Sequence, residues 1–121
     1  MKYEEEITMY MVSNTIQVLE GYGDQILERF KIRQGIEDMP GFKELKVLKS
    51  LGKQGYDEVL VHTVWQDKAA FENWFSSREF HLAHRKPART ETGEKMVVSN
   101  SIDHYEVIVE SDTTLAVGYV G

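Results

Sequence analysis

The chain has 121 residues, of which 41% are hydrophobic and 11% aromatic, so it can form one compact domain with an apolar core but not two full domains. Its 14 Lys and Arg residues are outnumbered by 20 Asp and Glu residues, and the net charge of −6 opposes non-specific attraction to nucleic acid or an anionic membrane surface. It contains no cysteine, which excludes disulfides, zinc–thiolate sites, iron–sulfur clusters and a thiol nucleophile, so any metal must be held by His, Asp or Glu.

The N-terminal sequence MKYEEEI carries an acidic run where a secretory signal would need basic residues followed by an apolar stretch. No apolar run approaches the length that a membrane-spanning segment needs. We therefore expect a cytoplasmic protein, a single domain over residues 1–121 with its core at about 9–110, whose partners include neither nucleic acid nor a membrane.

The first part of the chain predicts a strand and then a helix. Apolar and polar residues alternate from Ile7 to Glu20, which is the pattern of a strand with one buried side. One face of that strand carries Tyr10, Val12, Asn14, Ile16 and Val18. Gly21 and Gly23 mark a turn, after which Asp24 is expected to cap a helix that extends to about residue 34.

The middle of the chain predicts a β-hairpin. Residues 39–41 read Met-Pro-Gly and break the chain, and the β-forming residues 42–51 and 57–65 follow on either side of a turn at 52–55. These two segments are expected to pair as antiparallel strands.

A second helical region is expected to begin near Asp67 and to restart at Ser76, because Ser76 and Glu79 have the spacing of a capping box. Its inward-facing residues are Phe71, Trp74, Phe75, Phe80, Ala83 and His84. Residues 85–95 are polar, which suits a mobile loop, and residues 96–109 predict a final strand. The apolar, Gly-punctuated tail after Ser111 is not placed.

The order strand, helix, strand, strand, helix, strand predicts an α+β fold of the ferredoxin-like split βαβ type, with an antiparallel sheet and helices on one face. The other face of the sheet needs cover. In so short a chain a second copy is the simplest cover, so we expect a homodimer.

Three side chains could carry chemistry. An amide at Asn14 on a buried strand face must either bond to the protein or face a pocket, because an unsatisfied buried amide costs about 1 to 3 kcal/mol. Trp74 suits core filling, and His84 is either a structural histidine or an imidazole placed to ligate iron. The tripeptide Val-Ser-Asn occurs at 12–14 and again at 98–100, so Asn100 is an alternative polar pocket residue.

Cationic residues follow His84 directly, at Arg85, Lys86 and Arg89. They would complement carboxylates on a bound ligand, although a solvated loop explains them nearly as well. The sequence contains no Gly-rich dinucleotide or nucleotide loop, no nucleophile elbow and no paired-carboxylate arrangement. These patterns alone extend no further than a small α+β dimer.

The run VWQDKAAFENW at 64–74, followed by Ser77, Phe80 and the pair Ala83 and His84, resembles the central motif of the IsdG-type haem-degrading monooxygenases, in the antibiotic-biosynthesis-monooxygenase-like superfamily. The segments MVSNTIQVLEGYGDQILERF, EDMPGF and YDEVLVHTVW are similar to its other segments. The resemblance covers roughly residues 9–110 and implies a ferredoxin-like fold that dimerises through its sheets into an α+β barrel.

The resemblance also implies a site and a reaction. It makes His84 the proximal iron ligand, Asn14 a hydrogen-bonding group on the distal side of the iron, and Trp74 the residue that presses on the porphyrin and holds it ruffled. Haem would be both substrate and cofactor. Dioxygen and an external electron donor, supplied by a reductase, would open the porphyrin ring and release iron.

Two other functions stay open. Related barrels act as cofactor-independent monooxygenases on small aromatic or quinol substrates, and an apolar pocket lined by Phe71, Trp74 and Phe80 would suit such a substrate. A non-catalytic haem-binding module needs only His84 and an apolar slot.

Overall fold

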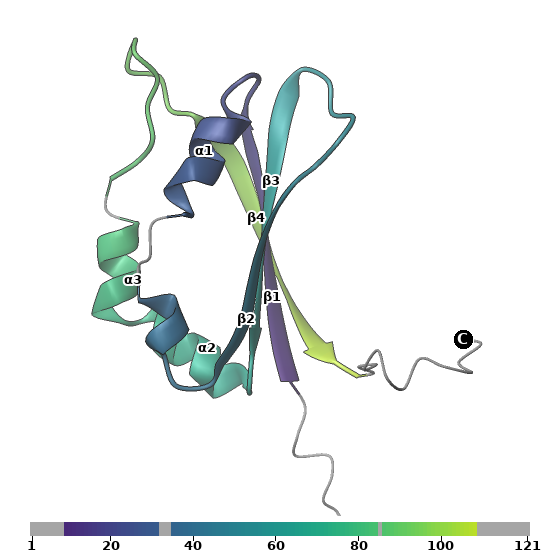
Figure 1. Cartoon of the computed structure of the whole chain (residues 1–121), viewed down its shortest axis with the longest axis vertical. Coiled ribbons are helices and arrows are strands. Elements are labelled where there is room, and N and C mark those ends of the chain that lie inside the picture. The colour runs from purple at the N-terminus through teal and green to yellow at the C-terminus, as the bar shows by residue number, and fades with distance from the viewer. Residues whose placement is uncertain (1–8, 32–34, 85, 109–121) are drawn as a thin grey trace, which may run out of the picture.

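The structure, a computed structural model, describes residues 9–31, 35–84 and 86–108 (Figure 1). The elements in chain order are β1 (Met9–Leu19), α1 (Gly23–Arg29), a short 3₁₀ helix (Ile36–Asp38), β2 (Phe42–Lys49), β3 (Tyr56–Trp65), α2 (Lys68–Phe75), α3 (Arg78–Ala83) and β4 (Val97–Val107). The predicted start of the first strand at 7–8, Arg85 and the tail after 111 lie outside the described residues.

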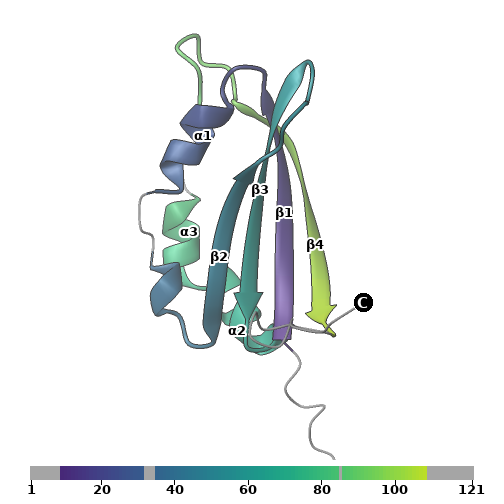
Figure 2. The ribbon, with the colours of Figure 1, turned by 45° about the vertical axis from the view of Figure 1, so that its right-hand side comes forward.

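The strands form one four-stranded sheet in the order β2-β3-β1-β4, and every neighbouring pair is antiparallel. This order is that of the ferredoxin-like fold, so the predicted fold class is confirmed. All the described helices lie on one side of the sheet, with α1 near one end of the strands and α2 near the other (Figures 1 and 2).

Alternation along β1 decides which side chains meet the helices. Val12, Ile16 and Val18 are buried, and Ile16 and Val18 pack with Ile26 of α1 in the main core cluster. Val59 of β3 is fully buried in the same cluster. Burial of an aliphatic side chain of this size contributes about 1.5–3 kcal/mol. We call this side of the sheet the helix-facing side.

The opposite side carries no described helix, and we call it the helix-free side. Cross-strand partners on it include Thr15 with Leu60 and Met11 with Tyr105. Tyr105 is 48% exposed there. This side therefore presents half-buried apolar and aromatic groups to its surroundings.

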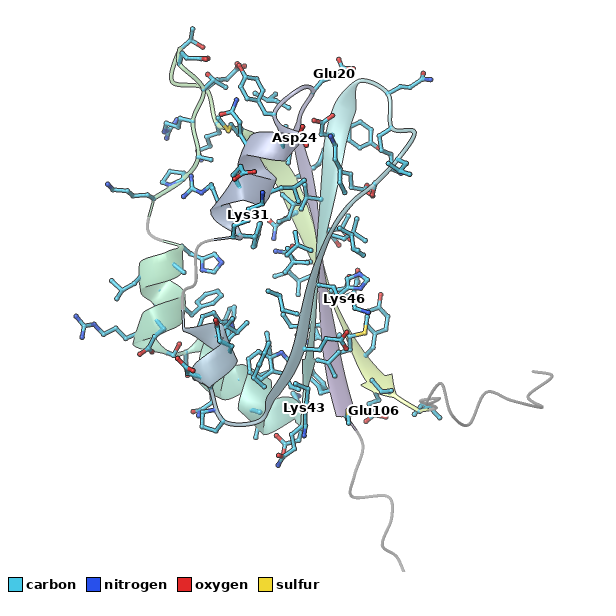
Figure 3. All side chains as sticks on the ribbon, viewed as in Figure 1. Glu20, Asp24, Lys31, Lys43, Lys46 and Glu106 are labelled. Carbon is cyan, nitrogen blue, oxygen red and sulfur yellow. The ribbon has the colours of Figure 1, made fainter. Side chains whose placement is uncertain are left out.

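The first helix starts differently from the expectation. Tyr22, not Asp24, occupies the cap position, with no side-chain hydrogen bond. Asp24 lies in the first turn of α1 (Figure 3). Its Oδ1 accepts a 2.9 Å hydrogen bond from Lys49. The cap is supplied from β3, because Asp57 Oδ2 accepts hydrogen bonds from the backbone N–H of Gly23 at 2.8 Å and Gly21 at 3.2 Å. A carboxylate is favourable at a helix N-terminus, so Asp57 takes the place predicted for Asp24.

The first helix is also shorter than expected, since it ends at Arg29.

The loop at 85–95, which the sequence predicted to be mobile, has hydrogen bonds of its own. Thr90 N–H donates to the Glu94 carbonyl at 2.8 Å, and Met96 N–H donates to the Ala88 carbonyl at 2.9 Å. Thr90 is buried, and an antiparallel bridge between Arg89 and Lys95 makes this segment a small turn.

Within the part of the chain that the structure describes, no helix combines the length and the apolar character needed to cross a bilayer.

Gly41, just before β2, packs closely against Ala70 of α2. Its φ is +84°, and a Cβ at this position would lie 2.5 Å from Ala70 Cβ. Gly52 has φ +80° with nothing within 4 Å of such a Cβ, which makes it a matched control. Gly52→Ala should lower the free energy of unfolding by about 1 kcal/mol, from backbone strain alone. Gly41→Ala should cost a further 1–3 kcal/mol, roughly, from overpacking, measured by urea denaturation. Equal losses in both variants would contradict the packing.

Candidate functional site

The second helix begins where the sequence predicts. Asp67 is its cap, and Asp67 Oδ1 accepts a 2.9 Å hydrogen bond from Ala70 N–H. As the last residue but one of α2, Trp74 lies against the protein and is only 7% exposed. Burial of Trp74 agrees with the simple expectation of core filling, and it fixes the position of the ring.

The joint between α2 and α3 corrects the predicted restart. Ser76 caps the end of α2, with its Oγ donating to the Glu72 carbonyl at 3.0 Å. Ser77 caps α3 instead, since its Oγ accepts from Phe80 N–H at 3.1 Å and donates to the Trp74 carbonyl at 2.7 Å. The capping-box spacing placed the restart one residue early, because two consecutive serines offer the same hydroxyl.

Phe80 joins the two predicted site residues of the helices. Its ring meets Trp74 edge-on, with centroids 5.6 Å apart and planes at 87°. It stacks on the imidazole of His84 at 4.1 Å and 30°. Phe80 also contacts Phe75 at 4.9 Å. Phe80 thus joins Trp74 of α2 and His84 at the end of α3 in one aromatic cluster.

His84 stands at the C-terminal cap of α3 with an exposed side chain. Its Nδ1 lies 2.8 Å from the Phe80 carbonyl oxygen. A carbonyl oxygen only accepts, so Nδ1 carries the proton in the neutral ring and the lone pair lies on Nε2. This arrangement, with one ring nitrogen bound to a carbonyl, fixes the ring and is common for metal-ligating histidines. His81 makes the same bond to Ser77 at 2.7 Å, so it is a natural comparison.

Asn14 lies on the helix-facing side of β1 and is half-buried. Its Oδ1 accepts a 3.1 Å hydrogen bond from Asn100 Nδ2 on β4. Both asparagines that the repeated tripeptide singled out are therefore on the same side of the sheet, bonded to one another. Asn14 comes from the sheet, whereas Trp74 and His84 come from the helices.

The strand β4 is open on the helix-facing side. Ile102, the direct partner of Asn14 across the sheet, is 45% exposed. From α2, Phe75 is 50% exposed and its ring contacts Phe71 and Phe80. The helix-facing side thus leaves apolar surface uncovered beside Asn14, which is a suitable lining for a flat apolar ligand.

Sequence reasoning missed a second polar pair on the same side. Tyr10 Oη lies 2.7 Å from His104 Nδ1, and the ring of Phe71 contacts both residues, at 6.1 and 5.6 Å between centroids. Only the register of β1 with β4 brings Tyr10 and His104 together. No local signal in either segment could have revealed the pair.

Of the cationic residues after His84, the structure describes Lys86 and Arg89. Arg29 Nη2 of α1 donates to the Lys86 carbonyl at 2.7 Å, and Arg89 Nη1 donates to the Gly93 carbonyl at 2.8 Å. Lys86 and Arg89 are both exposed. Arg85 lies outside the described residues.

Among the residues that the structure describes, no group of three His, Asp or Glu side chains is arranged to hold a metal ion. The histidines of α3 bind separate carbonyls through Nδ1, at Ser77 and Phe80.

Two adjacent serines allow a direct check of the joint that places Phe80 and His84. Ser77→Ala removes the cap of α3 and should lower the free energy of unfolding by about 1 kcal/mol. Ser76→Ala removes only a hydroxyl bonded to a carbonyl one turn back and should stay within about 0.5 kcal/mol. Thermal and urea unfolding of the two variants measure the difference. If Ser76→Ala lost more free energy of unfolding than Ser77→Ala, Ser76 would be the cap of α3, as the sequence predicted.

Comparison with known proteins agrees with this architecture. The sequence pattern of the family described as "Antibiotic biosynthesis monooxygenase" matches residues 9–86. Heme oxygenase (staphylobilin-producing) 1 of Staphylococcus aureus strain Newman is 32% identical over 99 residues, which covers 81% of this chain and 92% of that protein.

Solved structures share the fold. An antibiotic biosynthesis monooxygenase family protein from Bacillus cereus superposes with a TM-score of 0.71 at 28% identity, over 87% of this chain and 98% of that one. The heme-degrader MhuD of Mycobacterium tuberculosis, solved with two hemes in its active site, gives 0.66 at 23% identity, over 85% and 99%. SnoaB, a cofactor-independent oxygenase of Streptomyces nogalater, gives 0.64 at 14% identity, over 84% and 95%. By sequence pattern and by its similarity to the staphylococcal enzyme, the chain belongs to the antibiotic biosynthesis monooxygenase family.

Proposed function

We propose that the chain is a haem-degrading monooxygenase for which haem is both substrate and oxygen-activating centre. The observation that carries the proposal is the geometry of His84, an exposed imidazole whose Nδ1 is bound to the Phe80 carbonyl, which leaves Nε2 as the ring nitrogen available to ligate a metal. The 32% identity to a staphylococcal heme oxygenase supports the same reading.

The donor set fits iron that arrives already held by a porphyrin. A single imidazole binds a bare ion weakly, but it is sufficient as the axial ligand of haem iron. His84 supplies that imidazole, and the described residues supply no cluster of acidic or histidine ligands for a free ion. Haem is therefore the form of iron that this site suits.

The aromatic cluster fits the flat, apolar body of a porphyrin. Trp74 is held by burial and by its edge-on contact with Phe80, so it cannot turn aside easily. A rigid indole, separated from His84 by the Phe80 ring, would bear on a porphyrin ligated at His84 and resist its flattening. Ile102 and Phe75 add exposed apolar surface on the sheet and on α2.

Asn14 contributes from the sheet. Its side-chain amide can donate hydrogen bonds from Nδ2, because its Oδ1 already accepts from Asn100. A donor of this kind stabilises negative charge that develops on a reacting group. Haem bound in the site would supply the iron that activates dioxygen, with electrons from an external donor such as a reductase.

A second candidate function is a cofactor-independent oxygenase. The observation in its favour is the shared fold with SnoaB, together with the ring contacts that join Phe71, Trp74 and Phe80 through Phe75 into one aromatic cluster. Such an enzyme would oxidise a small aromatic or quinol substrate without haem. His84 would then have no role as a ligand.

Haemin titration of the purified protein, followed in the Soret region, tests the proposal. We expect saturation near one haem per chain, followed by loss of the Soret band and release of iron when ascorbate and catalase are added in air. A Soret band that survives ascorbate and oxygen would indicate a haem-binding module that does not cleave. Oxidation of a quinol by haem-free protein, without any Soret shift, would favour the cofactor-independent enzyme.

Variants of the site sharpen the test. His84→Ala should weaken haemin binding at least about tenfold and remove the imidazole signature from the spectrum, because the axial ligand is lost. His81→Ala, with the same Nδ1 contact on the same helix, should stay within about twofold. Asn14→Ala and Trp74→Phe should still bind haemin but cleave it about tenfold or more slowly. If His81→Ala lost binding and His84→Ala kept it, the ligand would be misassigned.

We also propose that the protein is a homodimer that pairs through the helix-free side. This side exposes Tyr105 by 48% and Leu48 by 42%, and half-buried side chains such as Met11 lie between them. Covering a sheet face of this composition with a second copy is favourable, because it removes apolar surface from water.

Tyr105 and Ile102 provide a matched pair for the dimer. They lie on the same strand with exposed fractions of 48% and 45%, but on opposite sides of the sheet. Tyr105→Glu should convert the dimer to monomer, because it buries an unpaired charge at the interface. Ile102→Glu should leave it dimeric in sedimentation equilibrium. The same oligomeric state for both variants would exclude the helix-free side as the interface.

A further inference from the structure

Asn100 lies on the helix-facing side, and its side chain is hydrogen-bonded to the side-chain amide of Asn14. Its Nδ2 donates to Asn14 Oδ1 at 3.1 Å. Backbone pairing puts Asn14 directly opposite Ile102 and Asn100 opposite Ile16, so the two amides are diagonal neighbours. Diagonal side chains in an antiparallel sheet are within reach of one another.

An irregularity in β4 brings Asn100 to this side. The register between β1 and β4 shifts at Gln17 and Val18, where Ser99 pairs with Gln17 but Val97 pairs with Val18. Val97 packs against the core cluster on the helix-facing side, and without the extra residue Asn100 would point to the opposite side. The bulge allows both residues to face the helices.

An asparagine amide has two orientations of nearly equal energy, which exchange its oxygen and its NH₂ group. A hydrogen bond donated to Oδ1 selects one of them by about 2- to 10-fold, given the net free energy of such a bond. It turns Oδ1 of Asn14 toward β4. The NH₂ group of Asn14 is then left to donate on the helix-facing side.

We infer that Asn100 is a positioning residue that holds the Asn14 amide with its donor group toward the bound substrate. This inference rests on the proposed function for Asn14. Asn100 does not itself touch the reacting atoms, and its side chain is exposed, so the bond contributes little to stability.

Asn100→Asp is the decisive variant, because a carboxylate only accepts hydrogen bonds. It forces Asn14 to turn its NH₂ group toward β4 and its oxygen toward the substrate. Asn100→Ala removes the preference without reversing it, and Asn100→Gln keeps a donor. Ser99→Ala is the control, since Ser99 directly precedes Asn100 on β4 and its Oγ donates a 3.5 Å hydrogen bond to Gln17 Oε1 instead of Asn14.

The first measurement uses haem-free, ¹⁵N-labelled protein and the side-chain NH₂ resonance of Asn14, identified by its loss in Asn14→Ala. In Asn100→Asp one of its protons should move downfield, because it now donates to a carboxylate. Ser99→Ala should leave the resonance in place. An unmoved resonance in Asn100→Asp would overturn the inference, whether or not the protein degrades haem.

The second measurement is haemin turnover. Asn100→Asp should lower kcat about tenfold or more, Asn100→Ala about 2- to 10-fold, and Asn100→Gln should restore most of the rate, with haemin affinity within about twofold throughout. The C–O stretch of the ferrous carbon monoxide complex should rise in Asn14→Ala, because a donor near the bound ligand is lost, and it should rise in Asn100→Asp for the same reason. Loss of rate in Asn14→Ala with a wild-type rate and C–O stretch in Asn100→Asp would overturn the inference and leave the proposed function intact. Absence of turnover in the unmodified protein would refute the proposed function instead.

Discussion

The register of β1 between β3 and β4 is the constraint on which the rest of the molecule depends. Because side chains alternate along a strand, this register puts Val12, Ile16 and Val18 under the helices and Asn14 in line with them. A slip of one residue would exchange the two sides of the sheet and expose the core. The antiparallel pairing on both edges of β1 fixes the register, and the bulge opposite Val18 adjusts it only near one end. The polar and apolar positions of the helix-facing side follow from these pairings.

The helices depend on that side in turn, but they have a constraint of their own. The α2–α3 joint is short, and Ser77 ties the two helices by bonding to Trp74 and to Phe80. Phe80 then sits between Trp74 and His84, so the indole and the imidazole cannot be moved independently. A site built in this way is sensitive to the length of the joint. A substrate that bound at His84 would meet a cluster that is already assembled.

Much of the fold could be predicted from the sequence, because the strands and turns depend on local periodicity. Alternation in β1 and the turn between β2 and β3 predict the strands, and their order with the helices predicts the ferredoxin-like arrangement. The site residues Asn14, Trp74 and His84 came from resemblance and not from periodicity. The structure places Trp74 and His84 on one cluster and Asn14 on the helix-facing side, and their roles remain predictions.

The errors share a physical cause. The cap of α1 comes from Asp57, more than thirty residues away in sequence, and a local pattern cannot report a distant carboxylate. The pairs Tyr10 with His104 and Asn14 with Asn100 likewise depend on the β1–β4 register. Ser76 and Ser77 differ only in which hydroxyl reaches Phe80 N–H, a choice set by backbone geometry.

The contact of Asp57 with Gly21 and Gly23 also bears on the order of folding. A helix of seven residues such as α1 is too short to persist alone in water, so it needs partners before it is stable. The carboxylate that caps it, Asp57, belongs to β3, and β3 reaches this position only after it has paired with β2 and β1. We therefore expect α1 to form late, after the β2–β3 hairpin has docked, and the folding nucleus to lie in the sheet. The N-terminal βα segment released from a ribosome would then wait for the hairpin before its helix became stable.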